Sequence, residues 1–515
     1  MSAARETRHF IHINGRWVHY RRFGEGPAVL VLHGSPQSSC AVAPFCRALA
    51  VEGHCAIAPD TPGNGLSTPL GGEPSSADYA EALSGFADAL GLGRVGLYGF
   101  HTGAAIACVF AARFAARVSA VAFNGLSAWT EAERKALLAA YLPRFAPVWD
   151  GSHMTWAWAR IEEQTVFFPW YESTPASRMV YDVPPPAALH QNAIDLLEAG
   201  DGYRAPYASA FNFRTDQWLP RVSCPTLIVA AARDPLRPHL TRPVFATRAV
   251  ATFDDQAGLA ATALAHLAAH PGDPPPPPPA SGEDGDGLAR GWQEGIAWTG
   301  RLAGAGRPLI LLHGAGGSGR IFAPVIPLLD RQRPLLVPDL PGHGRSAATE
   351  DGVPSTIATT ADSVAARLKA MGCDRPAIAG VGLGGQLAGH LVQTGQASAA
   401  GMLGPVTRDG TDPLDVAAPP LTPVWDGGHL LRAFRIARWE RLFDPWYRRD
   451  RAHAMPQANL DPADIQGRAM DLLGAGDRWA LALAAQRRDR EPPPPSVSAL
   501  ADPAAWATPL RRFGV

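Results

Sequence analysis

The sequence predicts an α/β protein made of two similar units, each with a mostly parallel sheet flanked by helices. Short apolar strands alternate with longer Ala-rich stretches: strands at 28–32, 55–58 and 94–98 are followed by a predicted helix at 103–116. The same ordered motifs recur in the second half of the chain. Near-continuous apolar strands separated by helices are typical of a parallel sheet that is covered on both faces.

The internal repeat is visible in five pairs of segments that keep the same order. The offset between partners is 280 residues for His33 and His313 and 276 residues for Trp149 and Trp425. The matching segments are 29–34 with 309–314, 59–67 with 338–346, 147–153 with 423–429, 169–171 with 445–447, and 195–201 with 471–477. Such an ordered series at a nearly constant offset indicates duplication followed by divergence.

A proline-rich segment separates the two copies. Residues 271–287 contain an unbroken run from Pro274 to Pro279 and then an acidic, Gly-rich stretch. We expect the proline half to be a stiff polyproline II spacer and the Gly-rich half to be a flexible joint. The predicted domains are therefore 1–270 and 288–515, joined by this linker.

Composition narrows the range of partners. The 515 residues carry 46 Lys and Arg against 47 Asp and Glu, a net charge of -1, which argues against a nucleic-acid or membrane surface and favours a small-molecule partner. Lysine occurs only at 135 and 369, so lysine chemistry is excluded. The six cysteines lack metal-ligand spacing, so we expect reduced thiols, no metal and no cofactor. No leader and no long apolar run is found, so we expect a cytoplasmic protein.

Three motifs together resemble the α/β-hydrolase superfamily. They are a strand ending in His-Gly, the pattern Asp-x-Pro-Gly-x-Gly-x-Ser at 60–67 and 339–346, and Gly-x-x-x-Gly at 99–103 and 380–384. The resemblance implies two tandem α/β-hydrolase-like units. It also implies a helical cap over each site, at about 127–222 in the first domain and about 407–490 in the second.

The nucleophile position departs from the family pattern in both copies. The family places a serine at the centre of the Gly-x-x-x-Gly turn, where this chain has His101 in the first copy and Gly382 in the second. A glycine has no side chain that can attack a substrate, so the second domain is predicted to be a degenerate copy. It is also predicted to be truncated, because only about twenty residues follow the prolines at 492–495, without a strand-Asp motif.

The resemblance also indicates where the other catalytic groups lie. Asp234 follows the apolar strand at 225–231, as the acid of the family's triad does. The triad histidine is expected near 254–258 but is absent, and His266 close by fits the face of a helix better than a catalytic role. Backbone N–H groups of Thr102 and the loop at Ser35 are expected to form an oxyanion hole.

His101 is the residue on which the predicted chemistry depends. Its imidazole is longer than a serine side chain and can reach the space of the missing triad histidine, where Asp234 would fix its tautomer. We therefore predict a His101/Asp234 dyad that acts as a general base. The alternative is that His101 only fills the pocket of an inactive site.

The Trp- and Tyr-rich cap supplies the predicted substrate pocket. His153, Trp149 and Trp170 are candidate lining residues, although core packing explains most of the aromatic residues. Asp150 precedes a predicted helix and is expected to cap it.

Three functions remain open at the level of sequence. The first is metal-free hydrolase chemistry on a small, partly apolar ester, amide or carbonyl compound in the first domain. The second is a non-catalytic pseudoenzyme that serves as a scaffold or binds a ligand. The third is a cofactor-free lyase or oxygenase that uses His101 as a base.

The two halves are predicted to pack on each other, because a truncated second sheet would otherwise expose an edge strand that invites aggregation. Residues 288–515 expressed alone should therefore be insoluble or unfolded. The measurement is the yield of soluble protein and its circular dichroism. A soluble, folded fragment would contradict the prediction.

Overall fold

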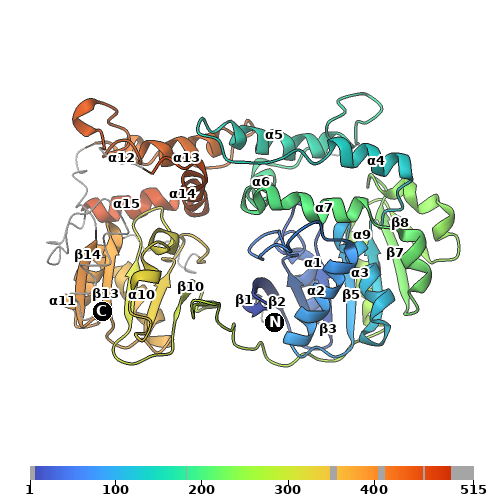
Figure 1. The fold of residues 1–515 in the computed structure, drawn as a ribbon, viewed down its shortest axis with the longest axis horizontal. Coiled ribbons are helices and arrows are strands. Elements are labelled where there is room, and N and C mark those ends of the chain that lie inside the picture. Colours follow the sequence, from blue (N-terminus) through green and yellow to red (C-terminus); the bar gives the residue numbers. More distant parts are fainter. Residues whose placement is uncertain (1–5, 181, 348–355, 404–411, 456–458, 489–515) are drawn as a thin grey trace. The chain divides into compact units, whose positions relative to one another are not determined.

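The computed structural model describes residues 6–180, 182–347, 356–403, 412–455 and 459–488. The chain divides into two compact units (Figure 1). The first unit comprises residues 1–146 and 156–281, and the second comprises 147–155 and 282–515. The segment 147–155, which the repeat places in the cap of the first copy, thus groups with the second unit.

The first unit is built on an eight-stranded sheet with the order β1-β2-β4-β3-β5-β6-β7-β8. The hairpin β1/β2 and the pair β2/β4 are antiparallel, and the remaining neighbours are parallel. The strands are β1 (Glu6–Ile13), β2 (Arg16–Phe23), β3 (Ala28–Leu32), β4 (Cys55–Pro59), β5 (Val95–Phe100), β6 (Val118–Asn124), β7 (Thr226–Ala231) and β8 (Val250–Phe253).

Helices cover both faces of this sheet because its central strands are apolar on both sides. In β3, Leu30 and Leu32 face the core beneath α2 (Ser76–Ala89) and α3 (Thr102–Arg113). Val29 and Val31 face the opposite core, beneath α1 (Ala43–Val51) and α9 (Gln256–Ala268). This alternation is the period-two pattern of a strand buried between two layers.

The second unit repeats the first six strands in a six-stranded sheet with the order β14-β13-β11-β12-β10-β9. Its strands are β9 (Ala289–Gln293), β10 (Ile296–Arg301), β11 (Leu309–Leu312), β12 (Leu335–Pro338), β13 (Ala377–Val381) and β14 (Ala399–Leu403). Within the described part of this unit, no strand corresponds to β7 or β8. The helices α10 (Ile357–Ala370) and α11 (Leu383–Gln393) correspond to α2 and α3. The predicted fold class, two mostly parallel sheets flanked by helices with the second domain covering fewer residues, is confirmed.

Helical segments follow β6 and β14 at the positions expected for caps. In the first copy they are α4 (Glu131–Ala140), α5 (Ser152–Val166), α6 (Pro186–Ala199), α7 (Arg204–Phe211) and α8 (Thr215–Trp218). In the second copy they are α12 (Leu414–Ala417), α13 (Gly428–Trp439), α14 (Pro462–Ala475) and α15 (Arg478–Arg488). Part of the predicted second cap lies outside the described residues.

Each copy of the cap contains an equivalent hydrogen bond at a matching position in the sequence. Trp170 Nε1 donates to the carbonyl of Tyr141 at 3.1 Å, and Trp446 Nε1 donates to the carbonyl of Ala417 at 3.0 Å. These two bonds join residues at the same offset, so the duplication is preserved at the level of individual contacts.

The start of the linker is attached to the first unit. Asp273 accepts the backbone N–H of Ala28 on its carbonyl at 2.9 Å and that of Arg94 on Oδ2 at 2.7 Å. The carbonyl of Pro276 accepts a hydrogen bond from Arg22 Nη1 at 2.7 Å. Hydrogen bonds at Asp273 and at Pro276 therefore attach the first part of the proline-rich segment to the first unit.

Alanine substitutions at Gly99, in the turn between β5 and α3, and at Gly85, in α2, are predicted to have opposite effects on stability. In Gly99→Ala the new Cβ would lie 2.4 Å from the carbonyl oxygen of Gly103, so we expect a loss of about 2 kcal/mol or more. Gly85 lies within α2 with nothing within 4 Å of an added Cβ, so Gly85→Ala should stabilise the helix by about 0.5–1 kcal/mol. Thermal unfolding of both variants is the measurement. A Gly99→Ala melting temperature equal to that of wild type would contradict the close approach.

Candidate active site

His101 stands at the turn where β5 ends and α3 begins. Its backbone has φ 48° and ψ -106°, a conformation that residues with a side chain rarely adopt. Gly103 makes the turn possible, because a Cβ there would lie 2.4 Å from the carbonyl oxygen of Leu32. The close approach of α3 to the end of β3 thus requires a tight turn, which presents the side chain of residue 101 at the carboxyl end of the sheet.

The structure brings His101 and Asp234 together, as the sequence predicted. Asp234 follows β7, and its Oδ2 lies 2.9 Å from His101 Nε2. Its other oxygen, Oδ1, accepts the backbone N–H of Leu236 at 2.8 Å, which fixes the carboxylate. The Asp234 side chain is 5% exposed and that of His101 is 30% exposed, so the imidazole forms the accessible end of the pair.

The charge of Asp234 decides which nitrogen of His101 carries the proton. Burial alone would raise the pKa of Asp234, but the facing His101 and the N–H of Leu236 outweigh burial and hold this pKa below its usual value. An ionised carboxylate can only accept hydrogen bonds. In the neutral form of the imidazole, Nε2 is therefore the donor, and Nδ1 has the lone pair, which no described residue engages.

Two neighbours that the sequence analysis missed define the position of the imidazole. A Cβ on Gly125 would lie 2.3 Å from His101 Cδ2 and 3.2 Å from Asp234 Oδ2, so only a glycine leaves room for this pair. The ring of Phe100 stacks on that of His101 with centroids 3.9 Å apart and an interplanar angle of 22°. The sequence signal that could have indicated the Gly125 contact is a glycine directly after β6, the strand beside β5.

The predicted oxyanion residues lie beside the turn. Thr102 is the first residue of α3 and is buried. Ser35 follows β3 in the neighbouring loop, where a Cβ on Gly34 would lie 3.5 Å from the Cβ of His101. His33 holds that loop: its Nδ1 contacts the carbonyl of Gly34 and its Nε2 accepts the N–H of Thr61, both at 2.8 Å. The role of Ser35 and Thr102 as oxyanion donors stays a prediction.

His313 makes the same two contacts in the second unit. Its Nδ1 lies 2.8 Å from the carbonyl of Gly314, and its Nε2 accepts the N–H of Leu340 at 2.8 Å. Burial lowers the pKa of His313 to about 4, so the ring is neutral and able to accept. Both histidines of the His-Gly motif therefore have all their nitrogen atoms committed to the backbone, which agrees with a structural role.

The second copy of the turn has the same backbone without a side chain. Gly382 has φ 50° and ψ -115°, close to the values of His101. The nearest side-chain atom to an added Cβ would be Nε2 of Gln486, at 3.5 Å. The described part of the second unit offers no carboxylate in the position of Asp234, since the counterpart of β7 is absent there.

His266 does not take the place of the missing triad histidine. It lies on α9, where its ring centroid is 5.2 Å from that of His270. The imidazole that contacts Asp234 is that of His101. The preferred interpretation of His266 as a helix-face residue agrees with this placement.

The three cap residues do not share one unit. Trp149 and His153 belong to the segment that groups with the second unit, whereas Trp170 belongs to the first. His153 is buried, its Nδ1 accepts the N–H of Val148 at 3.2 Å, and burial lowers its pKa to about 4. Trp170 is held by Arg160, whose guanidinium lies 4.4 Å from the ring centroid. A substrate-binding role for these three residues stays a prediction.

Asp150 behaves as a helix-capping residue. Its Oδ1 accepts the N–H of Ser152, the first residue of α5, at 2.8 Å. In the second copy, Oδ1 of Asp426 accepts the N–H of Gly428 at 2.9 Å. The shared Trp-Asp-Gly motif is thus explained by the start of a helix in both copies.

A buried carboxyl links each cap helix to the loop after the first parallel strand. Asp195 on α6 accepts the backbone N–H of Ser38 on Oδ2 and its hydroxyl on Oδ1, both at 3.0 Å. Asp471 on α14 accepts the hydroxyl of Ser318 at 2.8 Å. Burial raises the pKa of Asp195 to about 7 and that of Asp471 to about 6. The sequence showed this motif as a repeat, but only the structure shows what it contacts.

No metal site or membrane segment is evident in the part of the chain that the structure describes. There, no three or more His, Cys, Asp or Glu side chains lie close enough to hold a metal ion. No helix among these residues is long and apolar enough to cross a membrane.

Comparison with family models identifies the fold in both halves. A model described as alpha/beta hydrolase fold matches residues 27–248, and one described as alpha/beta hydrolase family matches residues 309–513. The chain therefore belongs to the α/β-hydrolase superfamily and carries two of its domains in tandem. The resemblance noted in the sequence motifs is confirmed.

Similar individual proteins match parts of the chain. It is 32% identical over 155 residues to 2-succinyl-6-hydroxy-2,4-cyclohexadiene-1-carboxylate synthase of Pectobacterium atrosepticum, covering 30% of this chain and 52% of the relative. It is 34% identical over 125 residues to haloalkane dehalogenase 2 of Mycobacterium tuberculosis, covering 24% of this chain and 43% of the relative. The chain thus spans about half or less of these curated relatives.

Among solved structures, epoxide hydrolase A from Mycobacterium thermoresistibile is similar at a TM-score of 0.41 and 17% identity. The match covers 51% of this chain and 98% of that one.

The raised pKa of Asp195 predicts that the stability of the folded protein depends on pH. The folded state binds this proton with a pKa of about 7, against 3.8 for an ordinary aspartate, so the stabilisation is present at low pH and lost as the pH rises from about 4 to about 7. Relative to Asp195→Asn, which mimics the protonated form, wild type should lose up to about 4 kcal/mol across this range. Unfolding followed at several pH values is the measurement. The exposed Glu73→Gln is the control, and an equal pH slope in Asp195→Asn and wild type would refute the assignment.

Proposed function

We propose that the first domain is an enzyme of hydrolase type in which His101 and Asp234 act as a general-base dyad. The observation that carries the proposal is the 2.9 Å contact between His101 Nε2 and Asp234 Oδ2 at the strand-to-helix turn. The proposed substrate is a small, partly apolar ester, amide or related carbonyl compound. No nucleic acid, membrane, metal or cofactor takes part in the proposed reaction, and the proposed location is the cytoplasm.

The direction of the proton transfer follows from the charge of the pair. Asp234 is ionised and holds the proton of Nε2, so the lone pair on Nδ1 is the base. Nδ1 takes a proton from water while the water oxygen forms a bond to the carbonyl carbon. Asp234 stabilises the resulting imidazolium, which returns the proton to the leaving oxygen or nitrogen as its bond to carbon breaks.

The absence of serine at the turn makes direct attack by water the proposed route. No acyl-enzyme forms, because the side chain at residue 101 acts as base and not as a hydroxyl nucleophile. Negative charge on the carbonyl oxygen is stabilised by the N–H of Thr102, at the start of α3, and by the loop at Ser35. The stacked ring of Phe100 keeps the imidazole in place.

The second domain has a different role in this proposal. Its turn carries Gly382, which has no side chain, so the domain is proposed to be a non-catalytic copy. The hydrogen bonds of its His-Gly motif and its cap are retained. We propose that selection has kept its fold and not its chemistry.

Replacing the base tests the proposal, and the second domain shows which replacement fits. Glycine already occupies this backbone conformation at residue 382, so His101→Gly removes the imidazole without straining the turn. In a screen of ester, lactone, amide and acidic-carbon substrates we expect kcat to fall roughly 10²–10⁴-fold in His101→Gly. Added imidazole should restore part of the rate. Asp234→Asn should lose most of the rate as well, because the amide no longer fixes the tautomer.

The control and the outcomes separate the three functions. His266→Gln removes a histidine of the same domain that lies on α9, and it should leave the rate unchanged. Full activity in His101→Gly would overturn the dyad. Turnover of acidic-carbon substrates alone would assign a cofactor-free lyase or oxygenase. Absence of turnover on every class would favour a non-catalytic, ligand-binding protein.

A further inference from the structure

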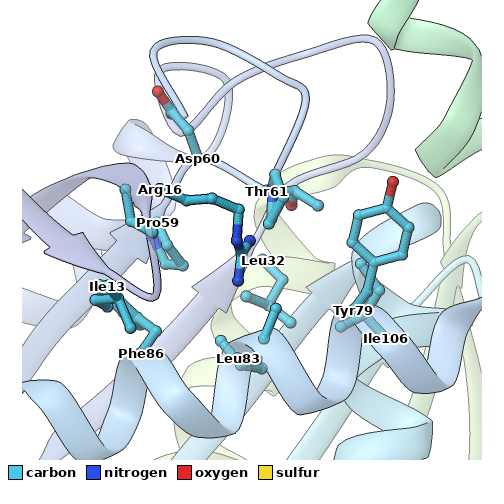
Figure 2. A pocket seen from close by; sticks show the side chains of 13 residues that line it. Ile13, Arg16, Leu32, Pro59, Asp60, Thr61, Tyr79, Leu83, Phe86 and Ile106 are labelled. Carbon is cyan, nitrogen blue, oxygen red and sulfur yellow. The ribbon is translucent and has the colours of Figure 1, made fainter. Parts of the chain in front are cut away.

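Figure 2 shows a pocket of the first unit between the β1/β2 hairpin and α2. Its volume is about 30 Å³, enough for only about two water molecules, and neither His101 nor Asp234 lines it. The contacts that hold the dyad in place lie instead at the carboxyl ends of β6 and β7, where the cap and the loop of Asp234 begin. These contacts decide how firmly the carboxylate is kept against the imidazole.

The loop after β7 forms a continuous series of turns from Asp234 to Arg242. The N–H of Arg237 donates to the carbonyl of Asp234 at 2.9 Å, and Oδ1 of Asp234 accepts the N–H of Leu236 at 2.8 Å. The N–H of His239 donates to the carbonyl of Leu236 at 3.0 Å, and that of Arg242 donates to the carbonyl of His239 at 2.9 Å. Because each turn fixes the next, a displacement of His239 would displace Asp234 as well.

His239 and Arg242 together hold both backbone groups of Ala128, at the start of the cap. The N–H of Ala128 donates to Nδ1 of His239 at 3.0 Å, and its carbonyl accepts a hydrogen bond from Nη1 of Arg242. Arg242 also donates two hydrogen bonds to the carboxylate of Glu133 on α4, at 2.9 Å and 2.6 Å. A bidentate pair of arginine and carboxylate is strong and directional. The loop of Asp234 is thus attached to the first residues of the cap.

Two hydrogen-bonded links connect the segment after β6 to the segment that carries Asp234. In the first link, the N–H of Gly125 donates to the carbonyl of Val229 at 2.9 Å, and the second link is the bond from Ala128 to His239. Asp234 lies between Val229 and His239 in the sequence, and Gly125 is the residue that leaves room for the dyad. Without the second link, the segment that carries the carboxylate would be less firmly held.

His239 can accept this hydrogen bond because its imidazole is neutral. The residue is 4% exposed, and burial together with the nearby Arg242 lowers its pKa to about 4. Because Nδ1 is the acceptor, the proton of the neutral ring is on Nε2. The ring of Trp129 packs edge-on against that of His239, with centroids 4.5 Å apart, and Trp129 also packs against Phe211 of α7. Aromatic residues of the cap thus hold the imidazole in addition to the backbone.

We propose that His239 is a positioning residue, which keeps Asp234 against His101 by attaching the loop of Asp234 to the start of the cap. The inference rests on the proposed function of the dyad, and it adds that the position of the cap controls the reactivity of the base. A misplacement of about 1 Å at a catalytic group can lower a rate roughly 100-fold. The attachment of the loop therefore has a measurable effect on catalysis although His239 itself does not contact the substrate.

Two variants of nearly equal size separate the hydrogen bond of His239 from its packing. His239→Asn places an amide oxygen near the position of Nδ1 and keeps an acceptor for Ala128, whereas His239→Leu has no acceptor. On the substrate that the screen identifies, we expect kcat to fall roughly tenfold or more in His239→Leu, with KM changed by less than about twofold. His239→Asn should retain most of the rate. Arg214→Met is the control, since this arginine is exposed and paired with Asp216, and it should react as wild type does.

Crystal structures of the variants in the full chain test the inference without a substrate. The distance between His101 Nε2 and Asp234 Oδ2 is 2.9 Å in wild type, and it should exceed about 3.5 Å in His239→Leu but not in His239→Asn. Arg242→Met removes the hydrogen bond to the carbonyl of Ala128, so it should lengthen the same distance. This second variant keeps the test available if His239→Leu does not fold.

The outcomes distinguish this inference from the proposed function. If wild type turns over no substrate but the distance lengthens in His239→Leu or Arg242→Met, the hydrolase activity is overturned and the positioning role is supported. The positioning role is overturned if the distance stays at its wild-type value in both variants, or if His239→Leu reacts with the kcat of wild type.

Discussion

The tight turn between β5 and α3 is the constraint on which the candidate site depends. Gly99 and Gly103 approach neighbouring backbone so closely that a Cβ on either would collide with it. Residue 101, in the middle of this turn, is held at positive φ, with its side chain at the carboxyl end of the sheet. Whatever side chain occupies residue 101 must stand there, and in this chain it is an imidazole.

The duplication separates what the fold needs from what the chemistry needs. The turn keeps its backbone in both units, with φ 48° at His101 and φ 50° at Gly382. The histidine that holds the following loop and the carboxyl that links the cap helix to it are also present twice. Among the described residues, the first unit alone combines the turn with a buried carboxylate that follows a further strand, and for this reason we place the proposed chemistry in the first domain.

Two buried carboxyl groups of the first unit have different partners and different charge. Asp234 has an imidazole and a backbone N–H as partners, and it stays ionised. Asp195 has hydrogen-bond donors but no cation among its described partners, and burial raises its pKa to about 7. The first arrangement suits catalysis, and the second couples stability to pH.

The sequence by itself determined the fold class, the duplication, and the pairing of His101 with Asp234. The fold class and the duplication depend on apolar strands and on motifs at fixed positions in the chain, which are local properties, whereas the pairing was inferred from the resemblance to the α/β-hydrolase superfamily. The room that Gly125 leaves for the imidazole and the link from Asp195 to Ser38 were decided by tertiary structure. Each of them joins elements distant in sequence, so its geometry exists only after the strands and helices have packed.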